Sequence, residues 1–426
     1  MRRHPIKEMG KKQTVHRLRL DNGLIVIVGE NPTADLIAGR IFLKNAGSLW
    51  EPREKAGLSN LLATVITKGT QNLSSGQIAE AVESIGAGLG ADASSDYFMI
   101  SVKTISKDFA SMLELISEIL RSPTFPEAEI ALEKRLIAQA IRSQKEQPFN
   151  VAFNHLREMI YQDHPYGLSI LGDEQTVSQL CREDLINYHK YHFRPDNLIV
   201  SLSGRINVDD AVDLVEKTLG DWPIPSHTLS RQNLPKLSSC PVEKIINQDT
   251  QQSIIMLGYL TVGVKSPDYP VLKLLSTYLG SGLSSRLFVE LREKRGLAYD
   301  VSAIYPTRLE PSQFVLYMGT APQNTTIAIE GLQKEAERLC YQELTPEELQ
   351  GAKNKLLGQY ALGKQTNGEL AQLYGWYETL GLGVEFDHEF QAMISKVTAE
   401  IAQNVAKNYL LSPYLSVVSS NYSTTH

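Results

Sequence analysis

The stretch Gly57-Leu-Ser-Asn-Leu-Leu-Ala-Thr-Val-Ile-Thr-Lys-Gly-Thr70 carries a strong helical pattern in the first half of the chain. Its apolar residues recur at positions i, i+3, i+4, i+7 and i+8, namely Leu58, Leu61, Leu62, Val65 and Ile66. This spacing predicts a helix that begins near Ala56 and buries one face. The opposite face presents Asn60, Ala63, Thr64 and Thr67. Positions i, i+3 and i+4 on such a face are the spacing at which a helix can offer two metal ligands and a base.

Strand-like runs surround this helix. Residues 15–20 and 24–28 are β-rich and are joined by Asp21-Asn22-Gly23, which predicts a hairpin. Alternation and apolar runs predict further strands at 37–43, 90–93, 97–103 and 198–203. Helical periodicity predicts helices at 109–121, 127–147, 182–191 and 208–219.

A Pro- and Ser-rich stretch, 223–242, predicts a linker, after which the order of elements starts again with a strand at 252–259 and a helix at 269–279. Pro126-Glu127 and Pro346-Glu347 each open a long helix and lie 220 residues apart (346 minus 126). Leu136 and Leu356 match at the same offset. We therefore predict two tandem homologous α+β domains, 1–222 and 243–426. Two unrelated α+β domains are the alternative.

Composition narrows the functional classes. The net charge of −6 does not favour a nucleic-acid partner, which needs a basic surface. Cys181, Cys240 and Cys340 are far apart and odd in number, which favours reduced thiols. No secretory signal or membrane-spanning run is recognised, so a soluble, cytoplasmic protein is expected. A removed organelle import sequence stays open.

The Ala-Gly-Leu beginning and the Lys-Gly-Thr ending of the segment 56–70 resemble the inverzincins of the pitrilysin and mitochondrial-processing-peptidase type. In active members of that family the helix carries His-x-x-Glu-His just before Lys-Gly-Thr. The two histidines bind zinc, the glutamate activates water, and a second glutamate farther along completes the site. The matching positions here are Asn60, Ala63, Thr64 and, on the predicted helix 127–147, Ala140 (or Gln139 in the neighbouring register).

An amide, a hydroxyl and two methyl groups do not replace these ligands, because zinc is held by thiolate, imidazole or carboxylate. Alanine at position 63 also removes the general base. The resemblance therefore implies a degenerate site, with no metal and no cofactor in this chain. His189 and His192 are three residues apart and could bind a metal, but nothing nearby completes a ligand set, so a packing role is favoured.

A second segment, Ser284-Ser-Arg-Leu-Phe-Val-Glu-Leu-Arg-Glu-Lys-Arg-Gly-Leu-Ala-Tyr299, reads as the counterpart of 57–70 in the second domain. A helix is predicted at 284–294 and a strand at 297–304, with Gly296 between them. Arg292 is a permanent cation with a planar donor fork, and Tyr299 is a neutral donor, so the pair could stabilise an oxyanion. Taken alone, a solvated charge and a packing tyrosine are the simpler interpretation.

The segment is similar to the second domain of the same inverzincins, where the matching Arg and Tyr reach the zinc site in the other half of the clamshell. The resemblance implies a fold of two domains, each a mostly antiparallel sheet covered by helices on one face. It also implies that half-length chains pair. We therefore expect a non-catalytic subunit of a heterodimeric zinc endopeptidase, whose partner carries His-x-x-Glu-His and holds the zinc. Arg292 and Tyr299 would then act in trans.

The substrates expected from this resemblance are unfolded peptides, bound by strand addition. The predicted edge is the small-residue run Gly90, Ala91, Asp92, Ala93 and Ser94. Two other functions stay open at this point. One is a purely structural subunit without a role in proteolysis, and the other is an autonomous hydrolase that uses an unrecognised site.

Overall fold

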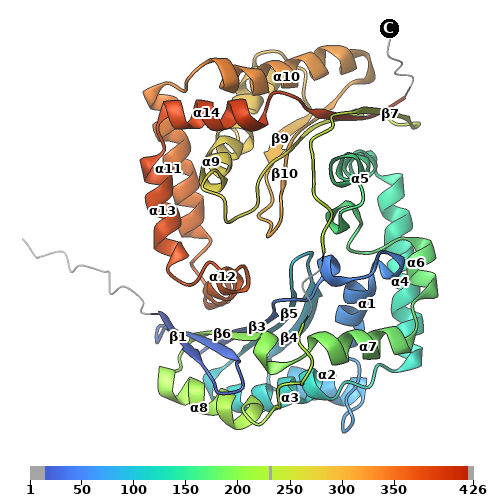
Figure 1. Ribbon diagram of the computed structural model, residues 1–426, viewed down its shortest axis with the longest axis vertical. Coiled ribbons are helices and arrows are strands. Elements are labelled where there is room, and N and C mark those ends of the chain that lie inside the picture. The colour runs from blue at the N-terminus through green and yellow to red at the C-terminus, as the bar shows by residue number, and fades with distance from the viewer. Residues whose placement is uncertain (1–14, 230–232, 421–426) are drawn as a thin grey trace, which may run out of the picture.

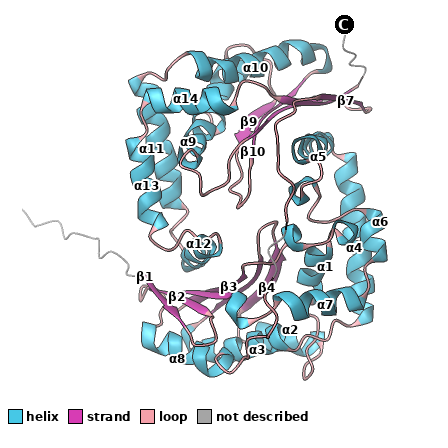
Figure 2. Ribbon diagram, in the orientation of Figure 1, coloured by secondary structure: helices cyan, strands magenta, loops and turns pink. Residues whose placement is uncertain are grey.

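The computed structural model describes residues 15–229 and 233–420. It is an α+β fold with two β-sheets, and the helices lie mainly on the outer face of each sheet (Figures 1 and 2). The first sheet has the strand order β1-β2-β6-β3-β5-β4. Its strands are β1 (Val15–Arg19), β2 (Ile25–Glu30), β3 (Ile37–Leu43), β4 (Gly88–Ala93), β5 (Phe98–Thr104) and β6 (Leu198–Gly204). Only the pairing of β2 with β6 is parallel among these strands.

The second sheet repeats this topology. Its order is β7-β11-β8-β10-β9, and only β7 and β11 run parallel among its strands. The strands are β7 (Glu243–Asn247), β8 (Ser253–Leu260), β9 (Asp300–Ile304), β10 (Gln313–Thr320) and β11 (Tyr414–Ser419). Without the additional β1, the first sheet matches the second strand for strand. The predicted α+β class with two mostly antiparallel sheets is confirmed.

The helices follow the same repeat. Those of the first half are α1 (Leu58–Val65), α2 (Ser75–Glu83), α3 (Phe109–Arg121), α4 (Glu127–Glu146), α5 (Pro148–Tyr161), α6 (Glu174–Gln179), α7 (Arg182–His192) and α8 (Val208–Leu219). Those of the second half are α9 (Tyr269–Gly280), a π-helix (Phe288–Glu293), α10 (Thr325–Tyr341), α11 (Pro346–Leu362), α12 (Asn367–Thr379), α13 (Phe386–Lys396) and α14 (Ala399–Tyr409). The described part of 223–242 contains no helix or strand, while 230–232 lie outside the described residues, as do residues 1–14 and 421–426 of the two predicted domains.

Two helices are exchanged between the halves, which the sequence did not predict. Helix α5 lies against β8 and β11 of the second sheet, and α12 lies against β3 and β6 of the first sheet (Figure 1). Each sheet therefore carries helices of its own half on one face and a helix of the other half on its second face. The prediction that helices cover one face of each sheet holds for the helices of the same half. It did not include the helix from the other half that covers the second face.

Glycine residues mark both contacts. Gly375 of α12 approaches the first sheet so closely that an added Cβ atom would lie 2.4 Å from the Phe42 ring. Gly258 of β8 faces α5, where an added Cβ atom would lie 2.7 Å from the Ile160 side chain. These close approaches need a residue without a side chain.

We expect Gly375→Ala to destabilise the chain by about 1–3 kcal/mol, because the methyl group overpacks the contact with Phe42. Gly358→Ala is the matched control, since Gly358 also lies in a helix but has open space around its Cα atom. Alanine there should stabilise by about 0.4–1 kcal/mol through the helix propensity and the unfolded chain. Urea denaturation of both variants would show the opposite signs. Equal effects would contradict the close contact at Gly375.

A buried polar network also joins the two halves. The Tyr166 hydroxyl donates a hydrogen bond to the Asp96 carboxylate, which is 4% exposed. The backbone N–H of Glu310 donates to the Tyr166 oxygen at 3.3 Å. Arg308 lies over the Tyr166 ring, with Cζ 5.0 Å from the ring centroid, and its Nη1 atom is 3.9 Å from Asp96. The loop between β9 and β10 is thus fixed to the first half.

Candidate functional site

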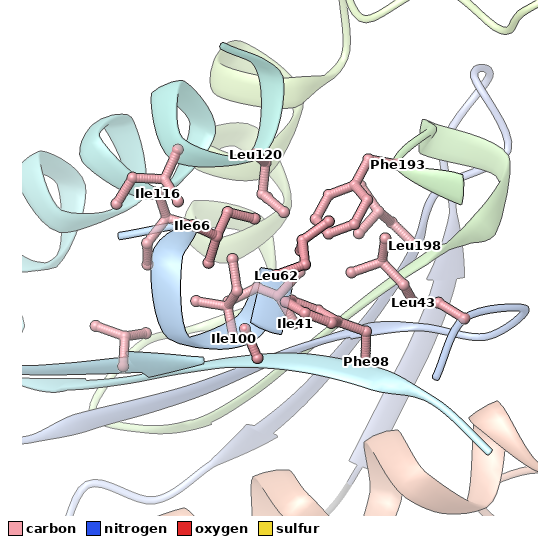
Figure 3. Close-up of a cluster of buried hydrophobic side chains, with 14 of the residues drawn as sticks. Ile41, Leu43, Leu62, Ile66, Phe98, Ile100, Ile116, Leu120, Phe193 and Leu198 are labelled. Carbon is pink, nitrogen blue, oxygen red and sulfur yellow. The ribbon is translucent and has the colours of Figure 1, made fainter. Parts of the chain in front are cut away.

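Helix α1 is held by packing on its apolar face. Leu62 and Ile66 point into the core between the sheet residues Ile41 and Ile100 and the α3 residue Ile116 (Figure 3). All five residues of the predicted apolar stripe are at most 2% exposed. The helix prediction is confirmed, and this packing fixes which face of α1 carries positions 60, 63 and 64.

The start of α1 is fixed by a buried acid. Glu51 accepts hydrogen bonds from the backbone N–H groups of Gly57, at 2.9 Å, and Ser59, at 2.6 Å. A carboxylate at a helix N-terminus is favoured by the helix dipole. Burial raises the pKa of Glu51, although these N–H bonds favour its charged form. Glu51 could not be recognised from the local pattern, because it precedes the helix by several residues instead of occupying the N-cap.

The four degenerate positions do not fit a zinc ion. Ala63 is 6% exposed and belongs to the hydrophobic core, while the Thr64 hydroxyl donates to the Leu61 carbonyl at 2.9 Å. Asn60 is half-buried and offers only an amide. Ala140 lies exposed on α4, next to the buried Ile141. None of these groups is a ligand that zinc accepts.

Other nearby residues do not compensate. Glu133 is an acid on α4 that contacts this region, and its carboxylate is 3.8 Å from the Lys68 ammonium group after α1. Within residues 15–229 and 233–420, no three His, Cys, Asp or Glu side chains are grouped so that they could hold a metal ion. The arrangement of α1 and α4 therefore provides a framework without donors.

His189 and His192 have packing roles. His189 Nε2 lies 2.8 Å from the Leu120 carbonyl oxygen and donates to it, and the ring packs against Phe125. The His192 ring instead packs on Tyr188 at 4.2 Å between centroids. Both side chains are buried. The two imidazoles thus serve different neighbours, which supports the interpretation favoured from sequence.

The predicted substrate-binding run lies at a sheet edge. Gly90, Ala91, Asp92 and Ala93 are in β4, which pairs with β5 on one side and is last in the strand order. Ser94 follows the strand and closes a turn, since its N–H donates to the Tyr97 carbonyl. Its own carbonyl already accepts from the Ser48 N–H at 3.0 Å. The geometry of Gly90–Ala93 is compatible with strand addition, and Ser94 is already engaged.

Arg292 and Tyr299 flank the turn between the π-helix and β9. Arg292 is exposed, and its guanidinium lies 5.0 Å from the centroid of the Phe288 ring. Tyr299 is 55% exposed, and its backbone N–H donates to Gly319. Within the described part of the chain neither side chain has a hydrogen-bond or ion-pair partner. Both donor groups therefore point away from the protein's own polar network.

The local structure differs from the prediction in two respects. The predicted helix 284–294 is mainly a π-helix over Phe288–Glu293, in which the Lys294 N–H reaches back to the Val289 carbonyl at 3.0 Å. π-Helices are rare in proteins overall, and those that occur are often found at functional sites. The predicted strand 297–304 begins only at Asp300, because Gly296, with φ of +62°, and the residues after it form the turn.

The assignment of counterparts was wrong. In both halves two longer helical segments lie between the central strand (β3, β8) and the edge strand (β4, β9), and in the first half two short 3-10 helices precede them. The counterpart of α1 is therefore α9, and the π-helix with Arg292 matches α2. The segments 57–70 and 284–299, which the sequence comparison paired, therefore occupy successive positions of the repeat and not the same position.

Comparison with known families agrees with this geometry. Residues 26–174 match the model of the insulinase family (peptidase family M16), and residues 179–356 match that of the peptidase M16 inactive domain. The chain belongs to peptidase family M16. The second match begins before β6, so it includes the last strand of the first sheet and most of the second half.

Several relatives and structures resemble this M16 chain over nearly its whole length. An uncharacterized zinc protease, YmxG of Bacillus subtilis, is 26% identical over 406 residues, which cover 93% of this chain and 97% of that protein. An uncharacterized zinc protease of Rickettsia felis is 28% identical over 351 residues, which cover 81% of this chain and 82% of that protein. The peptidase M16 inactive domain structure from Pseudomonas fluorescens has a TM-score of 0.89 at 22% identity, covering 97% and 100% of the two chains. A protease from Helicobacter pylori has a TM-score of 0.85, also at 22% identity, covering 96% and 99%.

Other features of this M16 chain bear on the earlier expectations. Cys181, Cys240 and Cys340 form no disulfide. No helix in the described residues combines the length and the apolar character that a bilayer crossing requires.

The buried histidines predict an acid-sensitive fold for this M16 chain. Burial lowers the pKa of His164, of His189 and of His192 from 6.5 to about 4. Because the folded state resists protonation, the stability that they contribute is complete above about pH 6.5 and is lost as the pH falls toward 4. At roughly 1.4 kcal/mol per pKa unit, each histidine accounts for about 3 kcal/mol. Urea denaturation between pH 7 and 4.5 measures this loss.

The variant His189→Gln keeps a donor for the Leu120 carbonyl but does not titrate. It should remove the share of His189 from the acid-induced loss of stability. His388→Gln, on the exposed side of α13, is the control and should leave the profile as in the parent protein. An unchanged profile for His189→Gln would contradict the assignment to His189.

Proposed function

We propose that this chain is the non-catalytic subunit of a heterodimeric M16 zinc endopeptidase. The observation that carries the proposal is a mismatch within one chain. The α1 framework is packed and capped, yet positions 60, 63 and 64 offer zinc no ligand. Arg292 and Tyr299, by contrast, are exposed, and their side chains have no hydrogen-bond or ion-pair partner among the described residues. A partner subunit with His-x-x-Glu-His would hold zinc and the general base.

In this proposal Arg292 and Tyr299 complete the partner's site in trans. Both groups donate hydrogen bonds, and donors directed at the oxygen of a scissile carbonyl stabilise the negative charge that develops there. The exposed positions beside the π-helix support this role, because a surface that faces another subunit must leave its donors free. Unfolded peptide would add as a strand along Gly90–Ala93 of β4, where backbone pairing requires no particular side chains.

The test uses the full chain together with the M16 subunit that copurifies with it. We expect no zinc and no peptide cleavage with the purified chain alone, and chelator-sensitive cleavage of a quenched fluorescent peptide when the two subunits are combined. Zinc analysis of each subunit separates the two contributions. Stoichiometric zinc in this chain alone would refute the proposal. A partner that cleaves equally well without this chain would leave only a structural role.

A further inference from the structure

A second site lies between the two halves, apart from α1 and from Arg292. It is a cavity of about 710 Å³, lined by residues of β1, of the segment after β3, of the loop between β9 and β10, and of the end of α12. This volume lies within the range of pockets for small ligands, roughly 300–1,000 Å³. Both halves contribute to this cavity, and the exchanged helix α12 forms part of its wall through Glu378 and Thr379.

The charged groups in this wall do not balance. Glu378 is neutralised by Arg17, which donates to both carboxylate oxygens at 2.7 and 2.9 Å. Asp196 is neutralised in the same way by the buried Arg194, at 2.5 and 2.9 Å. Two acids of the wall are thus already paired, although both still favour the charged form of Lys44.

Three cations remain, namely Arg19, Lys44 and Lys265. Within the described residues none of their side chains has a hydrogen-bond or ion-pair partner. Glu310 is the remaining acid of the wall, so the cations are in excess. Lys44 is half-buried, and burial is the main cause that lowers its pKa. An anion bound beside it would relieve the cost of burying this charge.

The wall also offers apolar surface. Trp50 lines the cavity, and its indole N–H is buried without a hydrogen-bond partner in the described structure. Leu49, Leu309 and Leu380 provide apolar surface beside the charges. A ligand that fits both features has an anionic group on an apolar stem.

We propose that this cavity binds a carboxylate carried by an apolar peptide segment, with Lys44, Lys265 and Arg19 around the carboxylate. That the ligand is a peptide rests on the proposed function, whereas the charge imbalance does not. The carboxylate can come from the peptide's C-terminus or from an acidic side chain. In either case the chain would favour acidic over basic peptides.

The test measures binding to the full chain alone by fluorescence anisotropy. The probes are three labelled Leu/Ala peptides, one with a free C-terminal carboxylate, one amidated, and one amidated with a single glutamate. We expect the free carboxylate to bind at least about tenfold more tightly than the uncharged peptide, with affinity falling as salt is raised. If the glutamate peptide binds as tightly, side-chain carboxylates are accepted. If the glutamate peptide binds as weakly as the uncharged peptide, the site recognises only the C-terminal carboxylate.

The variants Lys265→Ser and Lys44→Met should each weaken binding of the carboxylate peptide about tenfold and leave the uncharged peptide unaffected. Lys265 is exposed, so its variant tests the site without a risk to folding. Lys334→Ser, on the exposed side of α10, is the control and should change nothing. Equal affinity for all three peptides, or full affinity in Lys265→Ser, would overturn the proposal. The proposed function does not depend on this result, since cleavage by the combined subunits is measured separately.

Discussion

Arg292→Ala should lower the kcat of the combined subunits by about 100- to 1,000-fold. Loss of one donor to a developing oxyanion typically has this effect, which corresponds to about 2.7–4 kcal/mol of transition-state stabilisation. Because the guanidinium is exposed and has no hydrogen-bond or ion-pair partner in residues 15–229 and 233–420, its removal leaves no buried group there unsatisfied. The decrease should therefore appear in catalysis and not in the folding of the subunit. Tyr299→Phe, which removes one hydroxyl, should act in the same direction.

Controls separate a catalytic role from a local structural one. Lys294→Ala removes a neighbouring cation whose Nζ atom contacts Glu290 at 2.7 Å, and it should leave turnover nearly unchanged. Tyr341→Phe is the control for Tyr299, because Tyr341 is also exposed, at 70%. Arg292→Lys keeps the charge but loses the donor fork, so partial activity is expected. Unchanged turnover in both Arg292→Ala and Tyr299→Phe would exclude the trans contribution and leave a scaffold.

Arg308→Met should destabilise the chain by about 1–3 kcal/mol at neutral pH, because it leaves a buried carboxylate without its cation. The Arg308 side chain is 24% exposed, and its Nη1 atom lies 3.9 Å from the buried Asp96 carboxylate, so its removal leaves that charge without its ion-pair partner. The methionine keeps much of the stem that covers the Tyr166 ring. The matched control is Arg205→Met, since Arg205 and Asp35 are also 3.9 Å apart but are 53% and 59% exposed. An exposed pair contributes less than about 1 kcal/mol.

The effect of Arg308→Met should also depend on pH. Burial raises the pKa of Asp96 above its ordinary value of 3.8. The folded state therefore takes up a proton more readily than the unfolded chain, and a neutral Asp96 needs no counter-charge. As the pH falls through the folded pKa, the difference between Arg308→Met and the parent should shrink. Urea denaturation at neutral and acid pH measures this, and a constant difference would contradict the role of the Asp96 charge.

Local patterns predicted the elements that bury a periodic face. Helices α3 and α8 and strand β3 have the predicted bounds. The apolar residues of the two helices repeat every 3.6 residues, and those of the strand are buried on both faces of the sheet. The repeat of the two domains followed from Pro126 and Pro346, which do open α4 and α11. The exchange of α5 and α12 could not be predicted, because the apolar face of a helix shows that the helix is packed but not against which sheet.

The candidate site was predictable in its residues but less so in its shape. The absence of zinc ligands at Asn60, Ala63 and Thr64 follows from residue chemistry alone. The π-helix at Arg292 was missed because π-helices differ from α-helices by one hydrogen-bond step and carry no composition of their own. The cavity around Lys44 was also missed, since its residues come from segments that are hundreds of positions apart.

The exchange of helices constrains the synthesis of the protein. The first sheet is complete in sequence when β6 ends at Gly204, but α12 begins only at Asn367. At 5–20 residues per second the ribosome needs on the order of ten seconds or more to reach it. Until then Ile25, Phe42 and Ile199, which pack near α12 in the finished protein, have no cover from that helix. A nascent or truncated chain would therefore depend on a chaperone to protect this face from aggregation.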